Sequence, residues 1–263
     1  MSKKWLIVFG LLLVVFCGCG GGACGVLAPV SEMSSQAHED FRHQCDIALG
    51  ADPSATRTTT AEATTSSVAP STSAQPTANP YASLTIAADD PDYTNRDRAC
   101  ATAMQVAPWQ GSVLAEPNTG PVAQCAADLA LRYPEAGGTA QTARYLRDVT
   151  FSASAASSSG ACAVRRAPPA ESAADCGTPD EQAGPVLLPQ RVPVQGYCGM
   201  TVDPDAVSPG DLVFWDYGAD GATRAGIALG TDEMVTVESG EFVRSRLPDT
   251  SDLQIKRVLE DGR

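Results

Sequence analysis

Histidine is nearly absent from this chain. His38 and His43 are its only two histidines, so residues 44–263 contain none. An imidazole is the usual base beside a catalytic serine or cysteine, so neither a Ser-His-Asp triad nor a cysteine–histidine pair can form within that stretch. Lysine is also scarce there: Lys256 is the only lysine after residue 4, and a serine–lysine pair would depend on it.

Several other signals are missing too. The sequence has no C-x-x-C pair, which disfavours a zinc site, and no phosphate loop or nucleotide-binding motif. We therefore expect no metal and no cofactor. The net charge is -13, and neutralising nucleic-acid phosphates needs clustered Lys and Arg, so we expect no nucleic-acid partner.

The N-terminus carries an apolar segment. Lys3 and Lys4 precede an apolar run at residues 5–16, and no charged residue follows before Glu32. A stretch of about 20 such residues can cross a bilayer, and lysines on the short side keep that side in the cytoplasm. We predict an uncleaved single-pass membrane helix within residues 1–30, with the rest of the chain extracytoplasmic. The alternatives are a cleaved signal peptide, or a lipoprotein modified at Cys19 or Cys24.

Six of the nine cysteines follow this segment. An even number on the exported side predicts up to three disulfides, whose pairing the sequence leaves open. The candidates are Cys45, Cys100, Cys125, Cys162, Cys176 and Cys198.

The chain divides by composition. Residues 31–50 form a short extracytoplasmic segment that suits a helix bearing Cys45, and a bond from Cys45 to the folded domain would hold this segment against it. Residues 51–80 are rich in Ser, Thr, Ala and Pro, too polar to offset their chain entropy by burial, so we predict a disordered stalk. Residues 81–263 form the folded domain, with an insertion at about 139–186.

Helical patterns precede strand patterns in this domain, which predicts an α+β fold with N-terminal helices packed on an antiparallel β-meander. We predict helices at 95–104, 122–133 and 139–149, an irregular loop at 151–184, two strands at 211–215 and 225–229 around a polar hairpin connection, and three more strands at 233–238, 241–247 and 253–259.

Two stretches carry a family resemblance. SPGDLVFW at residues 208–215, followed by RAGIALG at 224–230, resembles the C-terminal half of the NlpC/P60 family of cell-wall cysteine peptidases. In the N-terminal half, AMQVAPW at 103–109 and NTGP at 118–121 are similar to the segments before the family's nucleophile. The resemblance implies a papain-like fold and places Cys125 at the nucleophile position.

The same resemblance places Arg224 where the family has its catalytic histidine. Arginine stays protonated and cannot act as a general base. The family's D-C-S-G motif is Q-C-A-A around Cys125. We therefore expect a catalytically inactive module that binds peptidoglycan or an envelope partner protein. The alanine-rich composition and the predicted stalk fit an actinobacterial envelope assembly. We expect the binding residues Arg224, Trp215 and Trp109 in a groove between the Cys125 helix and the Arg224 strand.

Two alternatives stay open. One is an active peptidoglycan endopeptidase that uses Cys125 with an unconventional base, or with His38 or His43 brought back across the linker. The other is a spacer of stalk and head that binds nothing.

Overall fold

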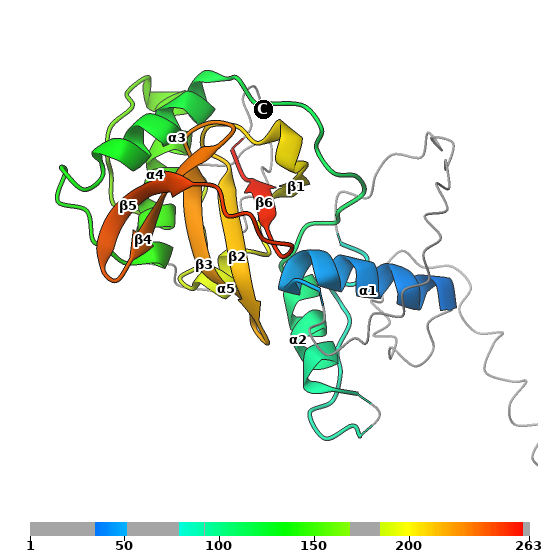
Figure 1. The fold of residues 1–263 in the computed structure, drawn as a ribbon. Helices are drawn as coiled ribbons and strands as arrows, with labels where there is room; N and C mark the ends of the chain where they lie inside the picture. Colours follow the sequence, from blue (N-terminus) through cyan, green and yellow to red (C-terminus); the bar gives the residue numbers. More distant parts are fainter. Residues whose placement is uncertain (1–34, 52–78, 92, 169–184, 260–263) are drawn as a thin grey trace, which may run out of the picture.

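The computed structural model describes residues 35–51, 79–91, 93–168 and 185–259. Helices and a six-stranded, open antiparallel sheet make up this part of the chain, so the predicted α+β class is confirmed (Figure 1). None of its helices is long and apolar enough to cross a membrane. The predicted membrane segment at residues 1–30 lies outside the described residues.

The helices begin and end where the sequence supplies local signals. The segment Thr94 to Asp97 forms a capping box at the start of α2, and α3 begins with Pro121 at its first position. Gly160, with φ at +66°, ends α4 in the left-handed conformation. The helices are α1 (Ser35–Leu49), α2 (Asn95–Met104), α3 (Pro121–Arg132), α4 (Thr142–Ser159) and α5 (Val192–Gln195), with a 3-10 turn, η2 (Pro204–Ala206).

Helix α4 is longer than the sequence predicted. It continues to Ser159, so the first part of the predicted loop at 151–184 is helical, and residues 169–184 lie outside the described residues. Tyr145, Leu146 and Val149 of α4 are almost fully buried. The stretch expected as an insertion therefore contributes a helix to the core.

The sheet has the order β1-β6-β2-β3-β4-β5. Strands β2 to β5 form the predicted meander, but β6 crosses back to pair with β2, and β1 pairs with β6 at the edge. The strands are β1 (Met200–Val202), β2 (Leu212–Gly218), β3 (Gly221–Ala228), β4 (Glu233–Glu238), β5 (Glu241–Arg246) and β6 (Gln254–Arg257).

The hairpin between β2 and β3 is tighter than predicted. Tyr217 pairs with Ala222 and Gly218 with Gly221, so only Ala219 and Asp220 connect the strands. The polar residues expected as a long connection continue the ladder instead, because a two-residue turn lets both strands pair to their ends.

The two faces of the sheet bury separate apolar clusters. Leu212 and Phe214 of β2 belong to a cluster with residues of α3 and α4, including Cys125. Val213 and Trp215 point the other way, as alternate residues of a strand must, and pack with Ala206, Val207, Ala228, Met234 and Ile255. Helices α3 and α4 cover the first face and leave the second uncovered.

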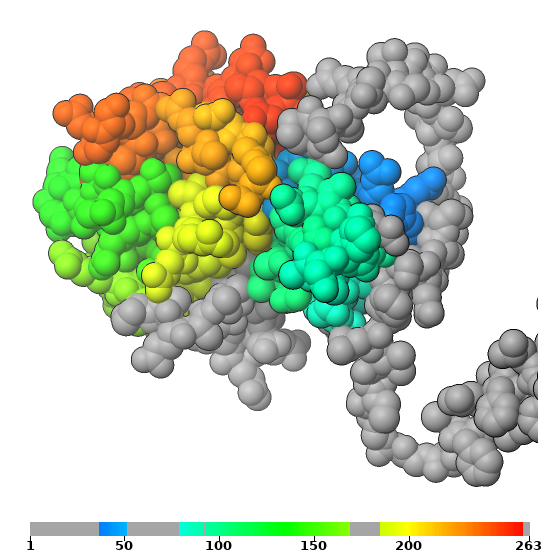
Figure 2. All heavy atoms as spheres, turned by 90° about the horizontal axis from the view of Figure 1, so that it is seen from below, coloured from blue at the N-terminus to red at the C-terminus, as the bar shows by residue number. Residues whose placement is uncertain are grey.

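A third cluster joins α1 to α2 at the side of the sheet away from β4 and β5 (Figure 1). Phe41 and Leu49 of α1 pack there with Met104 of α2. The chain leaves α1 through Gly50, whose φ is +81° and where a Cβ atom would lie 2.6 Å from the Tyr217 ring. In the space-filling view the atoms of α1 and α2 lie directly against each other (Figure 2).

The loop before β2 is anchored by a buried ion pair. The guanidinium of Arg257 on β6 donates to both carboxylate oxygens of Asp211, at 2.9 and 2.8 Å, and both side chains are almost fully buried. Ser208 completes the turn, because its backbone N–H donates to Asp211 and its hydroxyl accepts from Arg257. This network explains why the segment S-P-G-D opens the strand.

Lys256 carries a buried amine without a carboxylate partner among the described residues. Its side chain is 1% exposed, and its Nζ donates to the hydroxyl of Thr201 at 2.9 Å and to the carbonyl of Ile47 at 3.3 Å. Burial lowers the pKa of the Lys256 ammonium from 10.5 to about 7.

The ion pair of Asp211 should carry a large share of the fold's stability. Replacing Arg257 by methionine leaves the Asp211 carboxylate buried without its partner, so we expect the free energy of unfolding to fall by about 3–5 kcal/mol in urea titrations. Arg244→Gln is the control, because it breaks an exposed pair with Glu233 and should change little. Equal losses in the two variants would contradict this role.

Lys256 should make the fold more stable as pH rises from about 7 to 9.5. Within that window the unfolded chain keeps the proton on Lys256 while the folded chain has lost it, so unfolding becomes less favourable by an amount on the order of a few kcal/mol. The measurement is urea unfolding across this pH range, with Lys256→Met as the comparison. A variant that keeps the same rise would show that other groups cause it.

Candidate functional site

Cys125 lies in the first half of α3 and is bonded to another cysteine. Its Sγ forms a disulfide with Cys162, which follows the end of α4. The Cys125 side chain is buried, while Cys162 is partly exposed beside Arg132. A sulfur in a disulfide carries no thiolate, so in this form Cys125 cannot act as a nucleophile.

Other predicted disulfide cysteines are bonded as well. Cys45 of α1 pairs with Cys100 of α2. Cys198 is disulfide-bonded, and Cys176 lies outside the described residues.

Arg224 lies on β3, directly opposite Trp215 of β2. Its guanidinium carbon is 5.1 Å from the centre of the Trp215 ring, a cation–π arrangement, and its NH2 group forms an ion pair with Glu238 of β4. Trp215 is only 5% exposed, whereas 43% of the Arg224 side chain is exposed. The indole therefore supports an arginine head that solvent and ligands can reach.

Cys125 and Arg224 lie on opposite faces of the sheet. Cys125 packs with Leu212 and Phe214, whereas Arg224 shares the other face with Trp215. The prediction of a groove between the Cys125 helix and the Arg224 strand is therefore wrong. Because side chains alternate along β2, the strand cannot present Trp215 and Phe214 to the same side.

Trp109 lies in a different neighbourhood. Its ring is 6.1 Å from that of Tyr81, which in turn contacts Phe41 of α1. Trp109 does not line the groove that contains Trp215 and Arg224. Of the three expected binding residues, the structure brings together Trp215 and Arg224 and places Trp109 beside α1.

His38 and His43 are exposed on α1. That helix packs on α2 and accepts hydrogen bonds from β6. Cys125 is instead buried between α3, α4 and the sheet face that carries Leu212 and Phe214. The structure therefore does not bring either histidine to Cys125.

A groove of about 490 Å³ runs over the face that carries Arg224. Trp215 and Met234 give it apolar surface, and the hydroxyl of Ser245, which is buried, has no hydrogen-bond partner among the described residues. Its remaining lining consists of charged and turn residues, namely Asp216, Arg224, Glu238, Arg246, Pro248, Asp249, Thr250 and Asp252.

The acidic side of this groove is held in place by backbone contacts. Asp252 accepts a hydrogen bond from the Tyr217 N–H at 3.1 Å, and its pKa is lowered, chiefly by the hydrogen bond from Thr250. Asp216 has a φ of +58°, an uncommon value for a residue other than glycine, and its carbonyl accepts from Thr223. Both carboxylates therefore sit at the end of β2.

Sequence reasoning missed these acidic residues. Residues 248–252 read P-D-T-S-D, which indicates a turn between two strands and nothing more. The groove exists because that turn crosses the sheet on its way from β5 to β6, and this crossing depends on long-range pairing that the local sequence does not encode.

The groove and its surroundings offer no metal centre. No group of three or more His, Cys, Asp or Glu side chains in the described ranges is placed to hold a metal ion.

Comparison of this chain with family models, curated proteins and solved structures finds no match.

Proposed function

We propose that this protein is a membrane-anchored, extracytoplasmic module that binds peptidoglycan or an envelope partner protein and has no hydrolase activity. One observation carries the proposal. The Cys125 sulfur is in a disulfide, and the residue at the histidine position, Arg224, lies on the opposite face of the sheet. What remains at Arg224 is a groove suited to binding.

The disulfides support the extracytoplasmic part of the proposal. Cys45–Cys100 and Cys125–Cys162 are bonds that persist in oxidising compartments and are rare in the cytosol. The membrane helix at residues 1–30 remains part of the proposal, with a cleaved signal peptide and a lipoprotein as its alternatives.

We also propose descent from an NlpC/P60-like cysteine peptidase. Three features support it: a cysteine-bearing helix precedes the sheet, that helix packs on the sheet, and the family-like stretches form the neighbouring strands β2 and β3. The Arg224 side chain faces away from Cys125, so the support from this position extends to the strand pairing and not to a nucleophile–base pair.

Arg224 is the residue we expect to contact the ligand. A guanidinium binds a carboxylate through two parallel hydrogen bonds, and stacking on Trp215 holds the Arg224 head in place before the ligand arrives. Peptidoglycan stem peptides offer such carboxylates. A ligand carboxylate would have to replace Glu238 as the partner of Arg224.

The net charge of -13 makes general attraction to an anionic wall polymer unfavourable. Binding therefore has to come from local contacts such as Arg224, and it should survive salt better than a purely electrostatic association.

The competing proposal is an active hydrolase. It needs reduction of Cys125–Cys162 to free the thiol. It also needs a base, whereas Cys125 packs among apolar side chains and both histidines lie on α1.

Substitution of Arg224 tests the proposed groove. We expect Arg224→Gln to weaken co-sedimentation of the full chain with purified peptidoglycan by about tenfold, equivalent to about 1.4 kcal/mol, because a charge-assisted hydrogen bond is lost. The assay is run in mild detergent and repeated at high salt.

The matched control is Arg244→Gln. Arg244 is also an exposed arginine paired with a glutamate of β4, but it does not line the groove. Equal weakening by the two substitutions would show that general charge, not the groove, governs binding. No binding by the unsubstituted chain would favour an envelope protein partner or a spacer.

A further inference from the structure

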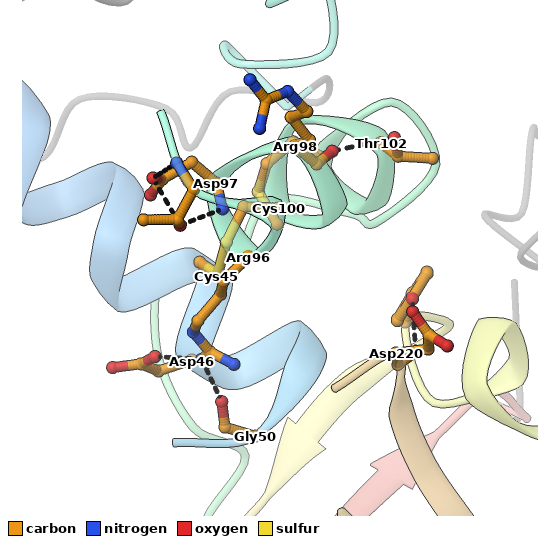
Figure 3. The surroundings of a disulfide bond; sticks show 12 residues. Cys45, Asp46, Gly50, Arg96, Asp97, Arg98, Cys100, Thr102 and Asp220 are labelled. Carbon is orange, nitrogen blue, oxygen red and sulfur yellow. Dashed lines mark hydrogen bonds and ion pairs between the residues drawn. A yellow bond between two sulfur atoms is a disulfide. The ribbon is translucent and has the colours of Figure 1, made fainter. Parts of the chain in front are cut away.

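Helix α1 is capped by side chains from elsewhere in the fold. The last carbonyls of a helix have no partners inside it and attract positive groups. Here Gln254 of β6 donates to the Asp46 carbonyl at 3.1 Å, and Lys256 of β6 donates to the Ile47 carbonyl at 3.3 Å. Arg96 of α2 donates to the Gly50 carbonyl and pairs with the Asp46 carboxylate (Figure 3).

The middle and the start of α1 also form hydrogen bonds with the rest of the fold. Gln44 exchanges two hydrogen bonds with the backbone of Gln110, its Nε2 donating at 2.9 Å and its Oε1 accepting at 3.0 Å. Nearer the start of α1, the hydroxyl of Tyr81 donates to the Asp40 carboxylate at 2.9 Å. These partners lie beyond residue 79, on the far side of the Ser/Thr-rich segment.

A disulfide also links α1 covalently to α2. Cys45 and Cys100 are 2% and 3% exposed, and their disulfide joins α1 to α2 beside Arg96 (Figure 3). The chain between Ala51 and Asn79 therefore starts and ends on the same folded body.

We propose that α1 is the point at which the folded domain is fastened to the N-terminal part of the chain, and that Cys45–Cys100 makes this fastening independent of the segment between Ala51 and Asn79. In a stalk, one cut would free the head. Here cleavage of that segment leaves a covalent link, which is broken only by reduction of Cys45–Cys100 to two thiols by a dithiol that is itself oxidised to a disulfide. The packing and hydrogen bonds of α1 must also be lost before the two parts separate.

The fastening also sets where the domain can work. If residues 1–30 span the membrane, which rests on the proposed function, five chain steps separate residue 30 from residue 35, a reach of at most about 18 Å. A flexible stalk of 30 residues would instead place the domain about 30 Å away on average and much farther when stretched. The groove would then meet ligands and partners close to the bilayer.

The test uses the full chain with a site for a sequence-specific protease inserted after Thr60. After complete cleavage, we expect one band of full size on a denaturing gel without reductant, and two fragments once a dithiol is added. Two fragments without reductant would overturn the proposal. A dimer linked through Cys45 and Cys100 would also overturn it, because α1 would then be fastened to a second copy.

Two paired variants make the result specific. Cys45→Ser with Cys100→Ser should separate into two fragments without reductant, whereas Cys125→Ser with Cys162→Ser should stay joined. Because a serine variant can fail to fold, the Cys45–Cys100 peptide is also sought by mass spectrometry in the alkylated, unsubstituted chain. Its absence, with Cys45 or Cys100 found alkylated, would contradict the proposal.

A second experiment, on membranes, distinguishes failure of this inference from failure of the proposed membrane anchor. In membranes washed with urea, which removes the non-covalent contacts of α1, nearly all of the cleaved domain should stay in the pellet until reductant is added. The Cys125/Cys162 variant should behave in the same way. Domain lost to the supernatant on cleavage alone would overturn the fastening. Uncut chain that does not sediment with membranes would instead contradict the anchor, and the gel would still decide the fastening.

Discussion

The buried pair between Asp211 and Arg257 fixes where β2 begins against β6, and the positions of the candidate residues follow from that register. Leu212 comes next and faces α3 and α4, so Phe214 does too, while Trp215 must face the other way. Pairing of Trp215 with Arg224 then carries Arg224 to the face opposite Cys125. A shift of one residue would reverse every one of these assignments.

This register places Cys125 and Arg224 on opposite faces of the sheet, although the sequence resemblance assigned both to one site. The cysteine-bearing helix and its disulfide belong to the structural core, and the arginine belongs to an open groove with Trp215 and several carboxylates. The fold therefore combines an open groove at Arg224 with a disulfide-bonded Cys125 on the opposite face. Helix α1 adds a second constraint, because its capping contacts and disulfide make it an integral part of the folded body.

The sequence was informative where structure is local. The capping box at Thr94 and Asp97 marks α2, and the apolar spacing of residues 122–133 marks α3 almost to the residue. The absence of an imidazole from residues 44–263 needed no structure at all. These features depend on neighbours in the chain, which a single sequence displays directly.

What the sequence could not supply depends on contacts between distant residues. Placing β6 beside β2 pairs Lys256 with Leu212, a choice set by packing in the whole sheet. The same holds for the partner of Cys125 and for the docking of α1, whose seat is built from residues such as Gln110 and Gln254. The acidic groove was missed for this reason, since its turn residues become neighbours of Trp215 only in the fold.

Our central proposal is that this fold binds without cleaving. Its most direct test is a peptidoglycan digestion assay on the purified full chain, oxidised and after mild reduction, followed by release of stem-peptide fragments. The account predicts no release above buffer in either state, and no difference between the unsubstituted chain and Cys125→Ser. Turnover by the unsubstituted chain that Cys125→Ser abolishes would contradict it.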